Sequence, residues 1–142
     1  MFLSQASKYA LQAILFMAQQ PTESKQSKEI AEALRIPRHF LAKILQDLSK
    51  RGLLQSSKGP GGGFKLAQPA DETRLIDVVQ AIEGNRFGAG CALGLPECSE
   101  TDPCPLHNQW AGIKDGIFSM LSDKSVRELL SETPNFRHRI PV

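Results

Sequence analysis

The sequence predicts a mainly α-helical fold with one small β-hairpin and a long helix toward the C-terminus. Apolar residues recur at helical spacing in several segments, a glycine-rich stretch separates two short apolar runs, and an apolar seam follows a loop that holds all three cysteines. Two helices joined by a short break and followed by a hairpin are the order of a winged helix-turn-helix. This is therefore the expected architecture.

The first half of the chain is expected to hold three helices. Residues 5–19 carry apolar side chains near helical spacing, and so do residues 27–34, where Ser27 can cap the first turn with its hydroxyl. A third helix over residues 37–51 opens on Pro37, because a first-turn position does not need the missing N–H. The glycine that follows this helix is its natural end.

A hairpin, two longer helices and a loop are expected in the remainder. Residues 57–63 form the hairpin turn between the two apolar runs. A helix over about 73–83 ends at Gly84, and an apolar seam with spacings of 4, 3, 4 and 4 predicts a helix over 106–121. Between them, residues 84–105 hold four glycines, three prolines and every cysteine, a composition typical of a loop.

We expect four parts along the chain. Residues 1–84 form the winged helix-turn-helix, and residues 85–105 form the loop with the cysteines. Residues 106–131 hold the long helix and a short terminal helix that opens on a capping box. Residues 132–142 form a loose tail.

Charge is divided unevenly between the two halves of the chain. Residues 1–68 carry ten Lys and Arg against four Asp and Glu, a net charge of +6, whereas residues 69–142 carry seven against eleven, a net charge of −4. A basic half joined to an acidic half indicates that one end of the molecule meets a polyanion. An ordinary solvated surface is the alternative.

Composition excludes several classes of protein. A chain of 142 residues fits a single small core and is too short for a large multidomain enzyme. Its longest apolar stretch, residues 10–18, is far shorter than the roughly 20 residues of a membrane span, and the N-terminus lacks the features of a secretory signal. Three cysteines within one short segment do not make a disulfide framework. We therefore expect a cytoplasmic protein that does not bind membranes.

The helix over residues 37–51 presents polar side chains opposite its apolar side. Arg and Lys can reach guanine O6 and N7 in the major groove, Gln can pair with adenine, and positive side chains neutralise phosphates. A solvated helix face is the alternative. The residues expected to contact double-stranded DNA, from this helix, the helix before it and the hairpin, are Ser27, Lys28, Arg38, His39, Phe40, Lys43, Gln46, Lys58, Gly59 and Gly61.

Four residues with metal-binding side chains fall in or next to the loop: Cys91, Cys98, Cys104 and His107. Thiolates in such an arrangement hold zinc or an iron-sulfur cluster. Zinc modules usually show Cys-x2-Cys pairs, so the wider gaps favour a cluster, but the spacing leaves both open. An enzyme with a thiolate nucleophile and His107 or His39 as its base is disfavoured, because no orienting acid or deep pocket is indicated. We expect neither enzyme activity nor a small-molecule substrate.

The apolar seam of the long helix predicts a dimer interface. Trp110, Ile113, Ile117 and Leu121 present more apolar surface than a lone amphipathic helix can hide. Two glycines four residues apart on this helix would let a second backbone approach closely. The seam is therefore expected to pack against the same helix of a second copy.

Four segments carry a family resemblance: residues 8–11 (KYAL), 30–37 (IAEALRIP), 58–64 (KGPGGGF) and 77–84 (DVVQAIEG). In this order they resemble the Rrf2 family of bacterial winged-helix regulators, and the likeness spans residues 1 to about 130. The chain also has three cysteines directly after the last segment. In this it resembles the cluster-binding branch of that family, which includes the regulators IscR, NsrR and RirA.

The resemblance implies a homodimeric transcription regulator, with repression as the expected mode, that binds a roughly palindromic DNA operator. Residues 85–105 then form the cluster-binding loop, and residues 106–131 provide dimerisation. The resemblance implies a 2Fe-2S cluster in preference to 4Fe-4S, with His107 as the fourth ligand beside the three cysteines. Such a cluster reports iron supply, oxidative stress or nitric oxide, and the sequence does not choose among these signals.

Overall fold

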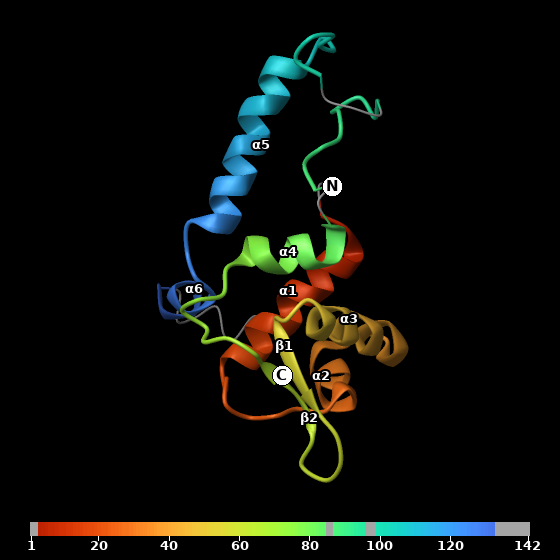
Figure 1. Ribbon diagram of the computed structural model, residues 1–142, viewed down its shortest axis with the longest axis vertical. Coiled ribbons are helices and arrows are strands. Elements are labelled where there is room, and N and C mark those ends of the chain that lie inside the picture. The colour runs from red at the N-terminus through yellow and green to blue at the C-terminus, as the bar shows by residue number, and fades with distance from the viewer. Residues whose placement is uncertain (1–2, 85–86, 96–98, 133–142) are drawn as a thin grey trace.

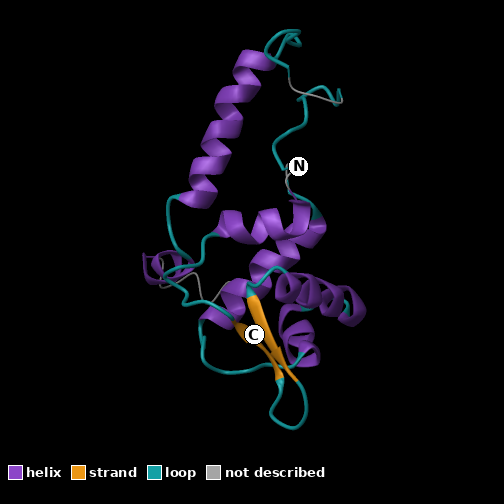
Figure 2. Cartoon of the chain, in the orientation of Figure 1, coloured by secondary structure: helices purple, strands orange, loops and turns teal. Residues whose placement is uncertain are grey.

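The computed structural model of the protein describes residues 3–84, 87–95 and 99–132. It confirms a mainly helical chain with one antiparallel hairpin, as Figures 1 and 2 show. The elements in chain order are α1 (Gln5–Ala18), α2 (Ser27–Leu34), α3 (Arg38–Lys50), β1 (Leu54–Ser57), β2 (Gly63–Leu66), α4 (Leu75–Glu83), α5 (His107–Ser122) and α6 (Val126–Glu132). From residue 133 on, the expected tail lies outside the described residues. No described helix is both long and apolar enough to cross a membrane.

Helix α1 is the centre of the core. Ala10, Ile14 and Met17 are almost completely buried, because they recur on one side of the helix at its 3.6-residue period. The helices α2, α3, α4 and α6 all contact α1. In Figure 1 these elements form the lower body of the molecule, and α5 rises away from it. Helix α1 therefore sets the relative positions of the other helices of this body.

A left-handed residue makes the sharp break between α2 and α3. Arg35 has φ 57° and ψ 42°, and the N–H of Ile36 donates to the Ala31 carbonyl oxygen at 3.0 Å. Ile36 is buried, so the break is anchored to the core. Pro37 is the N-cap of α3 and not its first residue as predicted, so the proline lies one position earlier than expected.

The start of α2 also differs from the prediction. Gln26, not Ser27, is the N-cap residue, and no side chain caps the first turn. The cause is the residue before it, because Lys25 exchanges two backbone hydrogen bonds with Phe64 of β2, at 2.9 and 2.8 Å. This bridge ends at Lys25, so Gln26 takes the extended cap conformation and Ser27 already lies in the first turn.

The glycines of the hairpin turn meet two separate geometric requirements. The strands β1 and β2 pair antiparallel, with Ser57 opposite Gly63 next to the turn. Gly59 and Gly61 adopt φ values of 86° and 77°, where a side chain would be strained. At Gly63 a Cβ atom would lie 2.5 Å from the Lys25 carbonyl oxygen, so only glycine lets these two backbones meet.

Helix α6 is tied to the linker that follows the hairpin. The N–H of Val126 donates to the Thr73 carbonyl oxygen at 2.7 Å, and the N–H of Arg127 donates to the Ala70 carbonyl oxygen at 3.1 Å. The predicted capping box before α6 is present, because the Glu128 N–H donates to the Ser125 hydroxyl at 3.1 Å and the Ser125 N–H donates to Glu128 Oε1 at 3.5 Å. These bonds fix the end of the described chain against the winged body, which consists of α1 to α4 and the hairpin.

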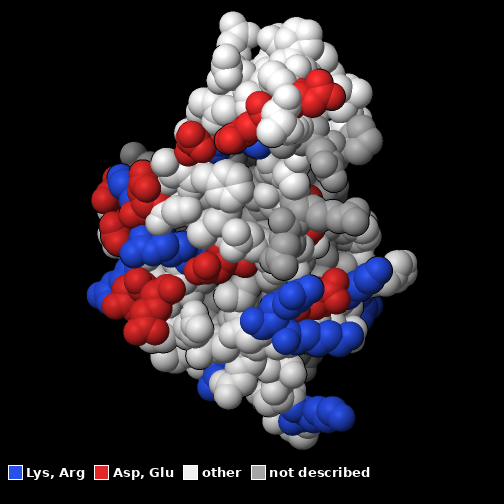
Figure 3. Space-filling model, turned by 45° about the horizontal axis from the view of Figure 1, so that its top comes forward, with Lys and Arg blue, Asp and Glu red and all other residues white. Residues whose placement is uncertain are grey.

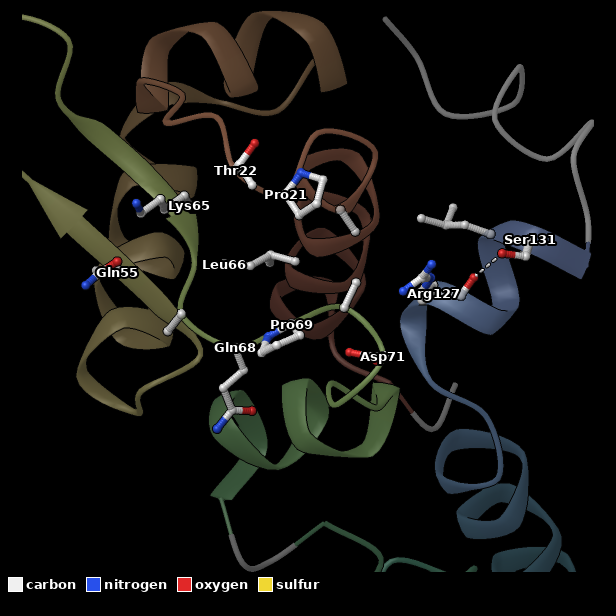
Figure 4. A pocket seen from close by; sticks show the side chains of 14 residues that line it. Pro21, Thr22, Gln55, Lys65, Leu66, Gln68, Pro69, Asp71, Arg127 and Ser131 are labelled. Atoms are coloured by element: carbon white, nitrogen blue, oxygen red, sulfur yellow. Dashed lines mark hydrogen bonds between the residues drawn. The ribbon is translucent and has the colours of Figure 1, made fainter.

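A hollow of about 690 Å³ remains between α6, the end of α1 and the hairpin (Figure 4). Arg127 extends from α6 toward it, and the buried residues Leu66 and Leu130 form part of its wall. None of its lining residues is a Cys or a His. This hollow is therefore separate from the cysteine loop and offers no thiolate or imidazole for catalysis.

Glu83 joins the end of α4 to the start of α1. Its Oε1 accepts from the Ser7 hydroxyl at 2.7 Å and from the Ser4 backbone N–H at 3.1 Å. Ser4 also caps α1, because its hydroxyl accepts from the Ser7 N–H. Burial raises the pKa of Glu83, but the hydrogen bonds from Ser4 and Ser7 outweigh it and hold this pKa below its ordinary value.

Replacing Glu83 with Gln is expected to destabilise the fold by about 1 kcal/mol near neutral pH, because a charged acceptor of two hydrogen bonds is lost at a half-buried position. The folded-state pKa lies below the unfolded one, so this stability is present above the unfolded pKa and is lost as the pH falls through the folded value. Urea unfolding at about pH 7 and about pH 3 measures the difference, which should shrink in acid. Glu72→Gln, at an exposed carboxylate, is the control; equal destabilisation by both changes near neutral pH would contradict the role of Glu83.

Candidate nucleic-acid interface and cysteine site

The N-terminal ends of α2 and α3 meet the hairpin on one face of the molecule. A shallow hollow of about 370 Å³ is lined by Lys28 from α2, Arg38 from α3 and Gly59 from the hairpin turn. A neighbouring hollow of about 390 Å³ adds His39, and Ser27 lines both. Half of the predicted DNA-contact residues, from three separate segments, are thus brought together.

Four further predicted residues extend this face. Lys43 and Gln46 follow His39 at helical spacing along one side of α3, and all three are exposed. The opposite, apolar side of α3 is buried in the core. Lys58 and Gly61 are exposed in the hairpin turn. The polar side of α3 and the hairpin turn are therefore open to a ligand.

Phe40 has a contact within the protein that the sequence did not predict. Its ring meets the Tyr9 ring of α1 edge to face, with the centroids 5.6 Å apart, and 43% of the residue stays exposed. Such aromatic pairs are favourable, so the contact supports α3 from the side of α1. A contact between Phe40 and DNA stays a prediction.

Positive charge gathers on the same end of the molecule. In Figure 3, Lys and Arg side chains form patches over α3 and at the hairpin tip, whereas the upper part of the view is mostly uncharged or acidic. This distribution follows the sequence, in which residues 1–68 carry a net charge of +6. A basic surface of this kind attracts a polyanion such as DNA.

The cysteine loop brings together two thiols that are 13 residues apart in the chain. The Sγ atoms of Cys91 and Cys104 lie 3.4 Å apart, and both residues are half-buried. Cys98, the third predicted ligand, lies outside the described residues. Within residues 3–84, 87–95 and 99–132, no group of three or more His, Cys, Asp or Glu side chains could hold a metal ion.

Local interactions lower the pKa of the Cys91 thiol. The backbone N–H of Leu93, which donates to Cys91 Sγ at 3.4 Å, contributes most. Burial opposes the lowering of this pKa, while the hydrogen bond between the Cys91 and Cys104 thiols and the positive charge of Lys114 add to it. A lower pKa raises the fraction of thiolate near neutral pH, and the thiolate is the form that binds metals.

His107 lies at the start of α5, next to the cysteine loop. Its backbone N–H donates to the Cys104 carbonyl oxygen at 3.0 Å. Both residues line a hollow of about 450 Å³, together with Glu100. The predicted Cys104-x-x-His107 pair therefore shares one site, with the histidine on the first turn of a helix.

The inner side of α5 is attached to the cysteine loop. The Trp110 indole N–H donates to the Gly90 carbonyl oxygen at 2.9 Å, and Lys114 Nζ donates to the Gly88 carbonyl oxygen at 3.0 Å. A pair of phenylalanine rings from the same two segments, with centroids 5.3 Å apart, adds an apolar contact. These contacts join α5 to the loop that runs beside it in Figure 1.

Part of the predicted dimer seam faces the cysteine loop of the same chain, and its packing against a second copy stays a prediction. Trp110 and Ile117 line a small cavity with Cys91, and Leu121 is only 3% exposed. The prediction overlooked the cysteine loop as a partner for this side of the helix. Ile113 is the one predicted seam residue with a large exposed fraction, 56%.

A different stripe of α5 faces solvent. Met120 is 58% exposed, and it follows Ile113 at helical spacing with Gly116 between them. Both Gly112 and Gly116 have open space around them. Sequence reasoning missed Met120, and it missed Lys114, whose signal was a charged residue within the otherwise apolar inner side.

Comparison with known proteins agrees with this arrangement. Residues 3–132 match the Rrf2 family, described as iron-dependent transcriptional regulators. A protein of Aquifex aeolicus assigned as an HTH-type transcriptional regulator is 34% identical and covers 100% of this chain and 99% of its own. The HTH-type transcriptional regulator IscR of Photorhabdus laumondii is 31% identical over 92% of this chain and 80% of its own. The solved structure of CymR, the global cysteine regulator of B. subtilis, has the same fold, with a TM-score of 0.75 at 23% identity over 92% of this chain and 97% of its own.

Proposed function

Because the chain belongs to the Rrf2 family of DNA-binding transcriptional regulators, we propose that it is a homodimer whose hold on a DNA operator depends on an iron-sulfur cluster. The proposed ligands are Cys91, Cys98, Cys104 and His107. The observation that carries the proposal is the approach of two thiols, 13 residues apart in the chain, to a distance of 3.4 Å. The loop that carries them lies at the opposite end of the molecule from α3 and the hairpin tip (Figure 1), where Lys and Arg side chains gather (Figure 3).

Helix α3 is the recognition helix of this proposal. Arg38, Lys43 and Gln46 are exposed along α3, and Arg or Lys can pair with guanine and Gln with adenine in the major groove. Lys28, which lines the hollow between α2, α3 and the hairpin, and Lys58, which is exposed in the hairpin turn, are the proposed phosphate contacts on either side of it. The hairpin then lies along the DNA backbone.

The thiols fit a metal-sulfur centre. Two sulfur ligands bonded at about 2.3 Å to one tetrahedral metal lie about 3.7 Å apart. The sulfur atoms of Cys91 and Cys104, at 3.4 Å, need only a small adjustment to bind one iron. Cys98 supplies the third thiolate, and His107 shares a hollow with Cys104. An imidazole ligand on a 2Fe-2S centre has a precedent in Rieske proteins, so this type is proposed over 4Fe-4S.

The cysteine loop joins the proposed DNA-binding part of the molecule, which ends with α4, to the proposed dimer helix α5. It follows α4, which Glu83 bonds to α1, and it leads into α5. Bound there, the cluster supplies a group that oxidants, nitric oxide or iron shortage can alter or remove. Without thiolate ligation the loop keeps mainly the bonds from Trp110 and Lys114. Its order then biases the spacing of the two recognition helices, a coupling of about 1–3 kcal/mol.

The second copy of the chain is proposed to pack on the exposed stripe of α5. Ile113 and Met120 are its large apolar residues, and Gly112 and Gly116 leave room for a second backbone. Each glycine weakens an isolated helix by roughly 1 kcal/mol, a cost that contact between helices offsets. The two recognition helices then read half-sites about one helical turn apart, or a multiple of it.

Arg38→Ala and Lys43→Ala are each expected to weaken operator binding by about 1–3 kcal/mol, because both side chains are exposed on the proposed recognition helix. Lys58→Ala should lower affinity for all DNA sequences alike and reduce the slope of log affinity against log salt by about 0.9. Fluorescence anisotropy at several salt concentrations measures both effects. Lys124→Ala, which removes a positive charge just after the C-terminal end of α5 and outside the proposed interface, is the control. Unchanged affinity and slope in the two α3 variants would remove α3 from the interface.

Ile113→Asp is expected to convert the dimer to a monomer, because a buried, unpaired carboxylate would replace an apolar contact at the helix pair. Sedimentation velocity at micromolar concentration measures the mass. Asn108→Asp, exposed on another side of α5, should remain dimeric. A native chain that is monomeric under these conditions would rule out the proposed dimer.

The proposed function is tested by comparing the operator affinity of anaerobically purified holo protein with that of Cys104→Ala at one fixed salt concentration. The holo protein should be brown and contain iron and sulfide, and the variant should be colourless, because it lacks one of the two paired thiols. We expect their affinities to differ by about 5- to 150-fold. Thr101→Ala, in the same loop, should behave as the native chain. Equal affinities on every promoter fragment would leave the cluster structural and end the sensor proposal.

Metal content separates the cluster from its alternative. A colourless native protein with stoichiometric zinc would support a zinc-stabilised DNA-binding module without redox sensing. His107→Ala should keep a more labile cluster with shifted absorption, because the site loses one ligand that binds iron more weakly than a thiolate does. Absorption that is identical in this variant and the native chain would assign the fourth ligand elsewhere.

A further inference from the structure

We propose that Lys114 is a positioning residue of the cluster site, which ties the Cys91 end of the loop to α5 and stabilises the reduced cluster through its charge. This inference rests on the proposed function, because it requires a bound cluster. Lys114 is the single charged residue on the inner side of α5, among side chains that otherwise form apolar or aromatic contacts with the loop.

Two neighbouring side chains of α5 hold the loop next to Cys91. Lys114 follows Trp110 by one helical turn, so both lie on the side that faces the loop. The Lys114 ammonium donates to the Gly88 carbonyl oxygen at 3.0 Å, and the Trp110 indole donates to the Gly90 carbonyl oxygen at 2.9 Å. Gly90 directly precedes Cys91. The two bonds therefore fix the backbone that carries this thiol.

The surroundings of Lys114 let its charge act on the Cys91 thiolate. The side chain lines a cavity of about 150 Å³ with Cys91 and with aromatic residues of the loop and the helix. Apolar walls lower the local dielectric, so a charge there acts more strongly than in water. In the described part of the chain, Lys114 forms no ion pair with a carboxylate that would cancel its charge.

The charge of Lys114 favours the more negative redox state. Reduction of the cluster by one electron adds one negative charge to the site and breaks no bond. An ammonium that shares a cavity with the Cys91 thiolate stabilises this state more than the oxidised one. Removing the charge should therefore make the cluster harder to reduce, whereas a guanidinium at the same position should keep most of the effect.

The test is a reductive titration of the holo protein with dithionite and redox mediators, in which the midpoint potential is read from the visible absorption of the cluster. Lys114→Met keeps the length of the apolar stem without the charge, and Lys114→Arg keeps the charge and a donor. Lys124→Met removes one positive charge beyond the other end of α5 and controls for net charge. We expect the equilibrium constant for reduction to fall about tenfold in Lys114→Met, which is about 59 mV for one electron. The other two variants should change it less than about twofold.

Each outcome decides the matter. Equal potentials in the native chain and Lys114→Met, or an equal fall in Lys124→Met, overturn the role of the charge. If Lys114→Met folds by circular dichroism but loses iron and sulfide while Lys114→Arg retains them, the positioning role is supported; loss from both folded variants overturns it.

A second variant separates the two bonds to the loop. Trp110→Phe removes the indole donor without a change of charge, so it should speed the loss of iron to a chelator and shift the potential much less than Lys114→Met does. A shift of the potential as large as that of Lys114→Met would contradict the specific role of the ammonium. The iron and sulfide content of the native chain is measured first. A native chain without iron and sulfide would overturn the proposed function itself, whereas a native chain that holds the cluster leaves only the role of Lys114 to be tested by the variants.

Discussion

The attachment of the cysteine loop to α5 is the constraint on which the candidate sensor site depends. Residues 84–105 have the composition of a loop, and glycine in particular loses much conformational freedom when it is ordered. Hydrogen bonds from Trp110 and Lys114 and a pair of rings hold one end of the loop to α5. The other end runs through Cys104 directly into the same helix. One helix therefore orders both ends, and this is why Cys91 and Cys104 meet.

The face proposed for DNA depends on a second constraint, the backbone pairing of Lys25 with Phe64. This bridge holds the chain before α2 against β2, so the first turn of α2 lies next to the hairpin. Lys25 is buried, and its ammonium donates to Gln20 Oε1 at 2.7 Å and lies 5.2 Å from the centroid of the Phe16 ring. A buried charge is stable only when it is compensated in this way. The shared hollow of α2, α3 and the hairpin is a consequence of this bridge.

Sequence patterns predicted the helices and the hairpin because local spacing decides which side of an element can be buried. They were wrong about the cap of α2, since its position depends on the bridge between Lys25 and a strand far along the chain. An apolar seam indicates that something covers it and not what does so, and the patterns therefore did not predict that Trp110 and Ile117 line a cavity with the cysteine loop. The exposed stripe with Met120 is interrupted by glycines, and its apolar pattern is correspondingly weak.

The segment made of the cysteine loop and α5 is tied to the winged body at its two ends, and this limits what a change at the cysteines can move. At one end Glu83 accepts from Ser7 of α1, and beyond the other end Arg74 Nη1 donates to the Ser122 carbonyl oxygen at 3.2 Å. The core around α1 is closely packed, and such cores resist internal deformation. Helix α5 has only Leu121 buried, so its direction is the least constrained feature between these two attachments. If α5 joins two copies, a change in the loop alters the distance between the two recognition helices and leaves each winged body intact. The cluster would then act on DNA through the spacing of half-sites, and not by unfolding the hairpin or α3.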